Sequence, residues 1–204
     1  PLSRLQTSRA VLTMALLLPA GDFRAFIFDC DGTLADNMHL HYEAWSRAME
    51  DFGGSYPEEL FYEWGGVPTG DIVRRLNDKF GLSLDVEEVV TRKEHYYRES
   101  IPKVEPVHEV IALAREHHGR IPLAVASGGH RDLVERTLRE LAVAELFDAV
   151  VTAEDYVRGK PAPDPFLKAA ELLGVEPAHC LVFEDTATGE EAARAAGMQC
   201  VLVG

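Results

Sequence analysis

The sequence predicts an α/β fold: a parallel sheet with helices on both faces and an inserted helical cap. Two observations predict it. After residue 106, short apolar runs alternate with amphipathic stretches, the pattern of parallel strands joined by right-handed helical crossovers. From Asn37 to about Val104 the pattern is helical, and the next strand signal begins only at Ile121. A simple doubly wound sheet has no such segment, so we expect it to form a cap.

The first predicted strand is the apolar run Ala25–Phe28, which leads directly into Asp29-Cys30-Asp31-Gly32-Thr33-Leu34. Alternate residues of an extended chain point to opposite sides, so Asp29 and Asp31 are expected to project the same way. Two carboxylates on one side can share a metal ion and divide nucleophilic and acid/base roles. A solvated turn is the alternative, because Asp and Gly are common turn residues.

The inserted segment opens with a clear amphipathic helix that ends at Gly53-Gly54. Its apolar stripe consists of Leu40, Ala44, Trp45, Ala48, Met49 and Phe52. Further helical stretches surround Ile72–Leu76 and Val89–Tyr97. We therefore expect a core over residues 22–36 and 105–204, a helical cap over 37–104 and an N-terminal extension over 1–21.

The remaining elements follow in alternation. The helices are expected over residues 107–116, 131–141, 165–173 and 188–196, and the strands over 122–126, 149–152, 180–183 and 199–203. Asp164 is expected to cap the helix that begins at Pro165, and Gly174 is expected to end it.

Polar groups follow several of these strands. Ser127 and Gly128 come after one apolar run, Lys160 lies beyond the next strand, and Glu184-Asp185 ends another. Taken singly, they fit a helix-leading serine, a solvated cation and acids at a helix N-terminus. Because the carboxyl ends of parallel strands share one edge of a sheet, we expect them to converge with Asp29 and Asp31 in one site.

The amino-acid composition excludes some classes of binding partner. The 204 residues carry a formal net charge of −14, which argues against nucleic acid and against an anionic membrane surface. A small phosphorylated substrate remains compatible, because a bound cation can reverse the field inside a cleft. Cys30, Cys180 and Cys200 form no C-x-x-C pair, so we expect core thiols in a reduced, cytoplasmic protein.

The N-terminal stretch resembles a signal peptide only superficially. Arg4 and Arg9 precede an apolar run, but this run is too short to span a membrane and no A-x-A site follows it. We expect an extension rather than a secretion signal, with Met14 as a candidate original start.

The D-x-D-G-T-L segment that starts at Asp29 resembles the first motif of the haloacid dehalogenase-like superfamily. Ser127 is similar to the second motif, Lys160 to the third and Glu184-Asp185 to the fourth, in the family's order. The resemblance covers nearly everything after Gly21. It implies a Rossmann-like catalytic core, in which the second motif's hydroxyl and backbone amides hold phosphate and the fourth motif's acids bind Mg²⁺.

The position of the cap is similar to that in the β-phosphoglucomutase-like branch, and Asp36, His41 and Ala44-Trp45 extend the match. The resemblance implies that His41 couples cap closure to acid/base chemistry, with packing in its helix as the alternative. It also implies that Lys93 approaches phosphate, with an ordinary solvated lysine as the alternative.

One position departs from the mutases. They carry Ser-Arg after a Gly-Val in the cap, and the Arg binds a second phosphate, whereas this chain has Pro68-Thr69 after Gly66-Val67. Without that bidentate cation a bisphosphate is harder to hold. The variant is more similar to the fructose-1-phosphatase and 6-phosphogluconate phosphatase relatives, so water is favoured over a sugar hydroxyl as the second acceptor.

The resulting hypothesis is a monomeric, Mg²⁺-dependent phosphatase of small phosphorylated sugars. Asp29 is the nucleophile and Asp31 the acid and then the base. Mg²⁺ is held by Asp29, the backbone carbonyl of Asp31 and Asp185, with Glu184 as a ligand directly or through water. Two alternatives stay open: a β-phosphoglucomutase-type isomerase of hexose phosphates and a non-catalytic module that binds sugar phosphates.

Overall fold

The computed structural model describes residues 16–204 and contains a five-stranded sheet. Its strand order is β5-β4-β1-β6-β7, and every neighbouring pair is parallel. The strands are β1 (Ala25–Phe28), β4 (Leu123–Ala126), β5 (Ala149–Val151), β6 (Cys180–Glu184) and β7 (Gln199–Leu202). The prediction of an α/β fold with a parallel sheet is confirmed. Part of the extension expected over 1–21 lies outside the described residues.

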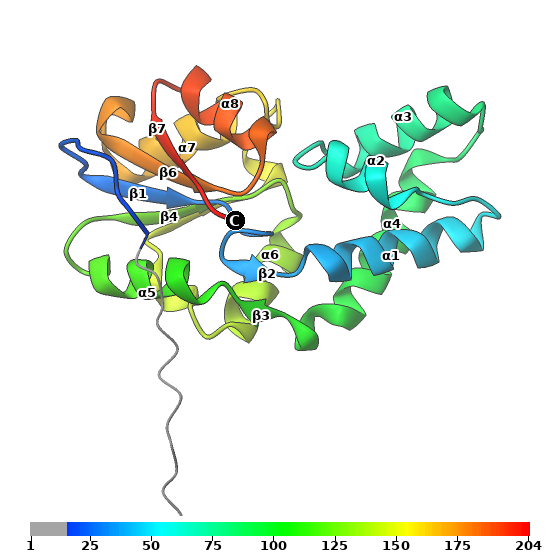
Figure 1. The fold of residues 1–204 in the computed structure, drawn as a ribbon, viewed down its shortest axis with the longest axis horizontal. Coiled ribbons are helices and arrows are strands. Elements are labelled where there is room, and N and C mark those ends of the chain that lie inside the picture. The colour runs from blue at the N-terminus through cyan, green and yellow to red at the C-terminus, as the bar shows by residue number, and fades with distance from the viewer. Residues whose placement is uncertain (1–15) are drawn as a thin grey trace, which may run out of the picture.

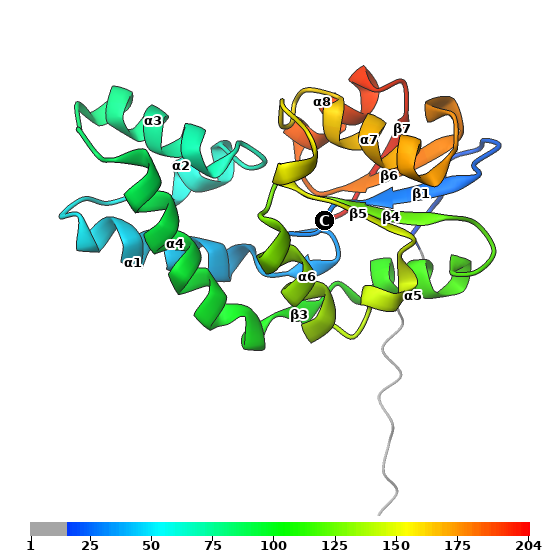
Figure 2. The same ribbon diagram turned by 180° about the vertical axis from the view of Figure 1, so that it is seen from behind.

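Helices cover both faces of this sheet (Figures 1 and 2). On one face, α5 (His108–His117) and α6 (Arg131–Glu140) pack against Phe26 and Phe28. On the other face, α7 (Asp164–Leu173) and α8 (Ala187–Ala195) pack against Ala25 and Ile27. Because alternate residues of β1 feed opposite cores, the strand is buried on both sides, which explains its uninterrupted apolar sequence.

The cap consists of α1 (Met38–Asp51), α2 (Glu58–Glu63), α3 (Thr69–Phe80) and α4 (Val86–Ser100), which lie beyond one edge of the core in Figure 1. It has an apolar cluster of its own, built around buried Trp45, Phe61 and Leu76. This cluster is separate from the two that flank the sheet. The cap helices therefore bury much of their apolar surface among themselves, whereas Leu40 and Ala44 of α1 and Tyr97 of α4 pack in the cluster that contains Phe26 and Phe28.

Two short strands join the cap to the core. β2 (Ala35–Asp36) precedes α1 and pairs antiparallel with β3 (Glu105–Pro106), which follows the short 3-10 turn Ile101–Lys103. Further 3-10 turns lie at Ala144–Leu146, Ala153–Asp155 and Pro177–His179. The pairing of β2 with β3 brings the entry and the exit of the cap side by side.

One predicted helix boundary is wrong. Asp164 is the first residue of α7 rather than its cap, and Pro163 precedes it without a capping side chain. The carboxylate of Asp164 instead accepts two hydrogen bonds from the guanidinium of Arg158, at 2.8 and 3.2 Å. The prediction for the other end is confirmed, since Gly174 ends the helix in the left-handed conformation.

Within residues 16–204, every helix is too short or too polar to cross a membrane.

Candidate active site

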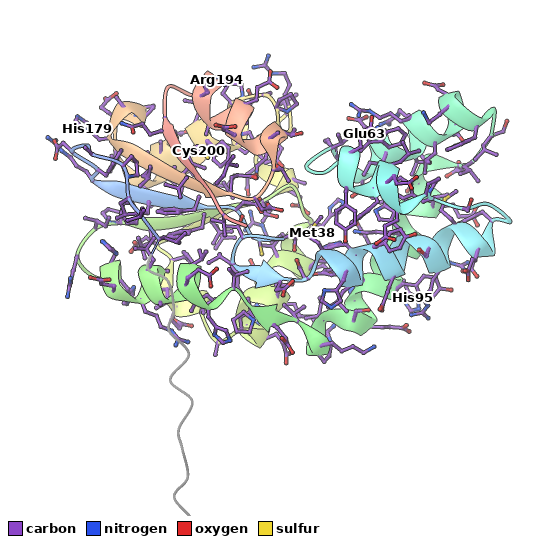
Figure 3. The ribbon with its side chains drawn as sticks, in the orientation of Figure 1. Met38, Glu63, His95, His179, Arg194 and Cys200 are labelled. Atoms are coloured by element: carbon purple, nitrogen blue, oxygen red, sulfur yellow. The ribbon has the colours of Figure 1, made fainter. Side chains whose placement is uncertain are left out.

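A cavity lies between the cap and the carboxyl edge of the sheet, and all of the candidate residues line it. The core supplies Asp29, Asp31, Ser127, Gly128, Lys160, Glu184 and Asp185, and the cap supplies His41, Thr69 and Lys93. Figure 3 places Met38, which also lines the cavity, at the junction where α1 leaves the core. Residues that are far apart in the sequence therefore converge as the topology of the sheet requires.

An acidic cluster forms the floor of this cavity. Asp29, Glu184 and Asp185 each offer a carboxylate oxygen, and these oxygens lie within 4.8 Å of one another. Burial and the neighbouring carboxylates raise the pKa of Asp29 in spite of Lys160. Burial and Glu184 raise the pKa of Asp185 to about 7. Repulsion of this kind disappears when a cation enters, so the cluster suits a positively charged ligand.

Lys160 is the cation built into the cluster. Its ammonium group donates to Oδ1 of Asp29 at 2.5 Å and to Oε1 of Glu184 at 2.7 Å. The lysine is 5% exposed, so the pairs are shielded from water, and the two carboxylates raise its pKa against the effect of burial. A lysine that is permanently charged at this place is available to attract phosphoryl oxygens beside Asp29.

Glu184 has both of its carboxylate oxygens engaged. Oε1 accepts from Lys160, and Oε2 accepts from the backbone N–H and the hydroxyl of Thr186, at 2.7 and 2.8 Å. Burial alone would raise the pKa of Glu184, but Lys160 and Thr186 hold it below its ordinary value. A Cβ at Gly189 would lie 1.9 Å from this carboxylate, so only glycine fits there. The fold thus fixes Glu184 from three sides.

Gly32 leaves room for the carboxylate of Asp185, as Gly189 does for that of Glu184. Its φ is +85°, which favours glycine, and a Cβ there would lie 2.1 Å from Oδ2 of Asp185. The other carboxylate oxygen, Oδ1, accepts from the hydroxyl of Thr33 at 3.3 Å. The turn that follows β1 and the end of β6 are therefore packed into direct contact.

Asp31 is held by residues that the sequence analysis missed. The side-chain amide of Asn37 donates to Oδ1 of Asp31 and to the hydroxyl oxygen of Tyr97, both at 2.6 Å. Nε2 of His41 lies 3.2 Å from the same Oδ1, although the two are not aligned for a hydrogen bond. Burial opposes ionisation, but His41, Asn37 and Lys93 together hold the pKa of Asp31 well below its usual range.

His41 and Lys93 connect the cap to this carboxylate. The ammonium of Lys93 lies 3.1 Å from Nδ1 of His41, and the imidazole stacks on Tyr97 at 3.8 Å between ring centroids. Burial and Lys93 lower the pKa of His41, which favours its neutral form. Because an ammonium cannot accept, Nδ1 accepts from Lys93, and the ring proton lies on Nε2, beside Asp31.

Ser127 and Gly128 form a tight turn after β4. The Ser127 hydroxyl accepts from the backbone N–H of Gly129 at 3.0 Å, and Tyr156 donates to the Ser127 carbonyl at 3.1 Å. A Cβ at Gly129 would lie 3.8 Å from Oδ2 of Asp31, so the turn passes close to that carboxylate. Tyr156 also lines the cavity and is a further residue that the sequence analysis did not single out.

The comparisons with known proteins agree with this arrangement. Residues 23–197 match the haloacid dehalogenase-like hydrolase family. The chain belongs to that family. This confirms the resemblance seen in the sequence.

Three relatives are informative. The fructose-1-phosphate phosphatase YqaB from Escherichia coli is 36% identical over 88% of this chain and 95% of that protein. The phosphorylated carbohydrates phosphatase from Thermotoga maritima is 34% identical over 86% of this chain and 82% of that protein. The crystal structure of a β-phosphoglucomutase from Clostridium difficile superimposes with a TM-score of 0.78 at 26% identity, covering 89% of this chain and 85% of that one. The chain is a phosphoric monoester hydrolase, as predicted, and the mutase alternative is less favoured.

Proposed function

We propose that this hydrolase removes phosphate from small phosphorylated sugars through an aspartyl-phosphate on Asp29, with Mg²⁺ as cofactor. The observation that carries the proposal is the pairing of two unlike carboxylates. Asp29 contacts Lys160, where an anionic phosphoryl group would be attracted, and Asp31 contacts Asn37 and His41, which orient it. Nucleophilic and acid/base roles need this division.

In the first step, a carboxylate oxygen of Asp29 attacks phosphorus and the bond to the sugar oxygen breaks. Asp31 gives its proton to that oxygen, so the sugar leaves as a neutral alcohol. The anionic phosphate next to Asp31 raises a pKa that is low in the free protein, which favours the protonated acid at this stage. Asp31 then accepts a proton from the water that hydrolyses the aspartyl-phosphate, and Asp29 and inorganic phosphate are released.

The cluster fits a hard divalent cation, because carboxylate oxygens gather there without a cysteine or histidine among the described residues of the group. Asp29, Asp185 and the backbone carbonyl of Asp31 would hold Mg²⁺. Glu184 would reach it through water, because both of its oxygens are already engaged. When bound, Mg²⁺ neutralises charge on the phosphoryl oxygens. Lys160, the hydroxyl of Ser127 and the backbone N–H of Gly128 would bind the same oxygens.

The mutase alternative requires a binding site for the second phosphate of a bisphosphate. Thr69 stands where the mutases have arginine, and among the described residues that line the cavity, Lys93 and Lys160 are the only Lys or Arg side chains. Lys160 lies beside Asp29, where it would bind the phosphoryl group that is transferred, and Lys93 contacts His41, so neither is left to bind a second phosphate. The alternative of a non-catalytic binding module is disfavoured, because it needs neither Asp29 nor the full acidic cluster.

A screen of phosphate release from sugar phosphates, with and without Mg²⁺, tests the proposal. We expect Mg²⁺-dependent release from several small sugar phosphates. In a parallel assay, β-glucose 1-phosphate and a glucose bisphosphate activator are coupled to glucose-6-phosphate dehydrogenase. Formation of NADPH in excess of phosphate release would establish the mutase instead. Tight binding of the esters without either product would establish the binding module.

A further inference from the structure

The two walls of the cavity differ in chemistry, and under the proposed function each contacts a different part of the substrate. The core wall carries Asp29, Lys160 and Ser127, where the phosphoryl group belongs. The group that leaves must then extend toward the cap. The residues of the cap wall therefore determine which leaving groups the enzyme accepts.

The cap wall is predominantly apolar. Its apolar side chains are Met38, Trp45, Phe61, Trp64, Val67, Pro68 and Ile72. Phe61 packs edge-on against Tyr56, and Trp64 also contacts that ring, so the aromatic part of the wall is held in place from behind. A sugar hydroxyl that faces the ring and aliphatic carbons of such a wall loses water without gaining a partner, whereas the C–H face of a ring packs against them favourably.

The polar side-chain groups of this wall are few. His41 and Lys93 contact each other. The hydroxyl of Thr69 and the indole N–H groups of Trp45 and Trp64 are the others among the cap side chains that line the cavity. The guanidinium of Arg75 lies 5.7 Å from the Trp64 ring centroid, but Arg75 does not line the cavity. Asp29, Asp31, Glu184 and Asp185 meanwhile make the cavity rich in carboxylates.

From this we infer that the substrate's leaving group is uncharged and presents an apolar ring face to the cap. The inference rests on the proposed function and narrows it. A carboxylate on the leaving group would be desolvated near other carboxylates, and the two nearby cations already have contacts. Lys93 contacts His41, which lies 3.2 Å from the Asp31 carboxylate, and Lys160 pairs with Asp29 and Glu184. Such burial of a further negative charge is unfavourable. Esters of sugar acids are therefore poor substrates, and esters of neutral ring-forming sugars are good ones.

The first test isolates the charge. Glucose 1-phosphate and glucuronic acid 1-phosphate share one ring and differ at a single carboxylate. We expect kcat/KM to be at least about tenfold lower for the acid, mainly through KM. Equal or higher efficiency with the acid would overturn the inference. Thr69→Arg supplies a cation to the cap wall and should narrow the gap between the two esters.

The second test isolates the apolar face. Cyclohexylmethyl phosphate and glucose 6-phosphate are both esters of primary alcohols on a six-membered ring, but the first has no hydroxyls. We expect the KM of the cyclohexylmethyl ester to be no higher than that of glucose 6-phosphate, and Trp64→Leu to raise it severalfold. The control is Phe80→Ser, which removes an aromatic ring that is 46% exposed on α3 and does not line the cavity. A KM about tenfold higher for the hydroxyl-free ester would overturn the inference.

A binding measurement separates this inference from the proposed function. Calorimetry with the Asp29→Asn protein reports the affinity for each of the four esters without turnover. Absence of hydrolysis by the unmodified enzyme would count against the proposed function. Tighter binding of the glucuronic acid ester than of its neutral partner would count against the inference alone.

Discussion

In the core, the polar side chains at the cavity contact one another, whereas in the cap the side chains at the same cavity are mostly apolar and contact a cluster of their own. Lys160 joins Asp29 to Glu184 in the core. In the cap, the comparable polar contact is that of Lys93 with His41, and it is directed at Asp31 of the core. The difference suggests that the core performs the chemistry and the cap selects the substrate. The following predictions test that division.

The largest effect is expected for Asp29→Asn, which keeps the shape of the side chain and removes the nucleophile. Turnover should fall by several orders of magnitude, with little change in the melting temperature. The matched control is Asp36→Asn, at a carboxylate that is 69% exposed on β2. Asp29→Asn protein with near-normal turnover, measured by phosphate release, would remove Asp29 from the role of nucleophile.

Removal of metal is the second test of the core. Chelation with EDTA should abolish phosphate release, and added Mg²⁺ should restore it.

The raised pKa of Asp185, about 7, predicts how many protons Mg²⁺ displaces when it binds. Below pH 7 the carboxyl group of the metal-free protein is mostly protonated, and above pH 7 it is mostly ionised. The proton that Asp185 releases on binding of Mg²⁺ should therefore be lost as the pH rises through about 7, so total proton release should be larger at about pH 6 than at about pH 8. Calorimetry in buffers of different ionisation enthalpy measures this release. Proton release that is independent of pH would contradict this.

The third prediction concerns the contact between the two regions. His41→Gln removes the ring that links Lys93 to Asp31, and turnover should fall by about a hundredfold. His41 helps to lower the pKa of Asp31, so its loss should raise that pKa and move the acid limb of the pH–rate profile to higher pH. His39→Gln, two residues away and exposed, is the control. An unshifted profile would leave His41 with a packing role.

The smallest effect is expected outside the cavity lining, where α4 of the cap contacts the start of α6. Oε1 of Glu94 lies 3.2 Å from Nε2 of His130, and Arg98 donates to Asp132 at 2.5 Å. Arg98→Ala should raise KM by no more than about threefold, because the pair is exposed to solvent. Arg47→Ala, which removes an exposed pair within the cap, should leave KM unchanged. A large fall in kcat for Arg98→Ala would show that this contact between α4 and α6 contributes to the chemistry.

The sheet and the gathering of the candidate residues were predictable, because hydrophobic periodicity marks the strands and a parallel sheet brings their ends together. The partners of Asp31 were not. Tyr97 is separated from Asn37 by 60 residues, and in the sequence it is one more aromatic on a helix. The hydrogen bond from Thr186 to Glu184 could not be predicted, because a threonine before a helix is expected only to cap it. Thr186 does cap α8, and its hydroxyl also donates to Glu184. β2 and β3 escaped notice because two residues are too few to show a period.

The pairing of β2 with β3 has a consequence for how such an enzyme can change. The chain leaves the core at Ala35–Asp36 and returns at Glu105–Pro106, and these segments are hydrogen-bonded neighbours. Everything between them is attached as a loop would be, so it can be lengthened, shortened or exchanged without interrupting the parallel sheet. An inherited catalytic apparatus can thus acquire new preferences through one insertion point, and a graft of a foreign cap between these strands is the natural route to redesign.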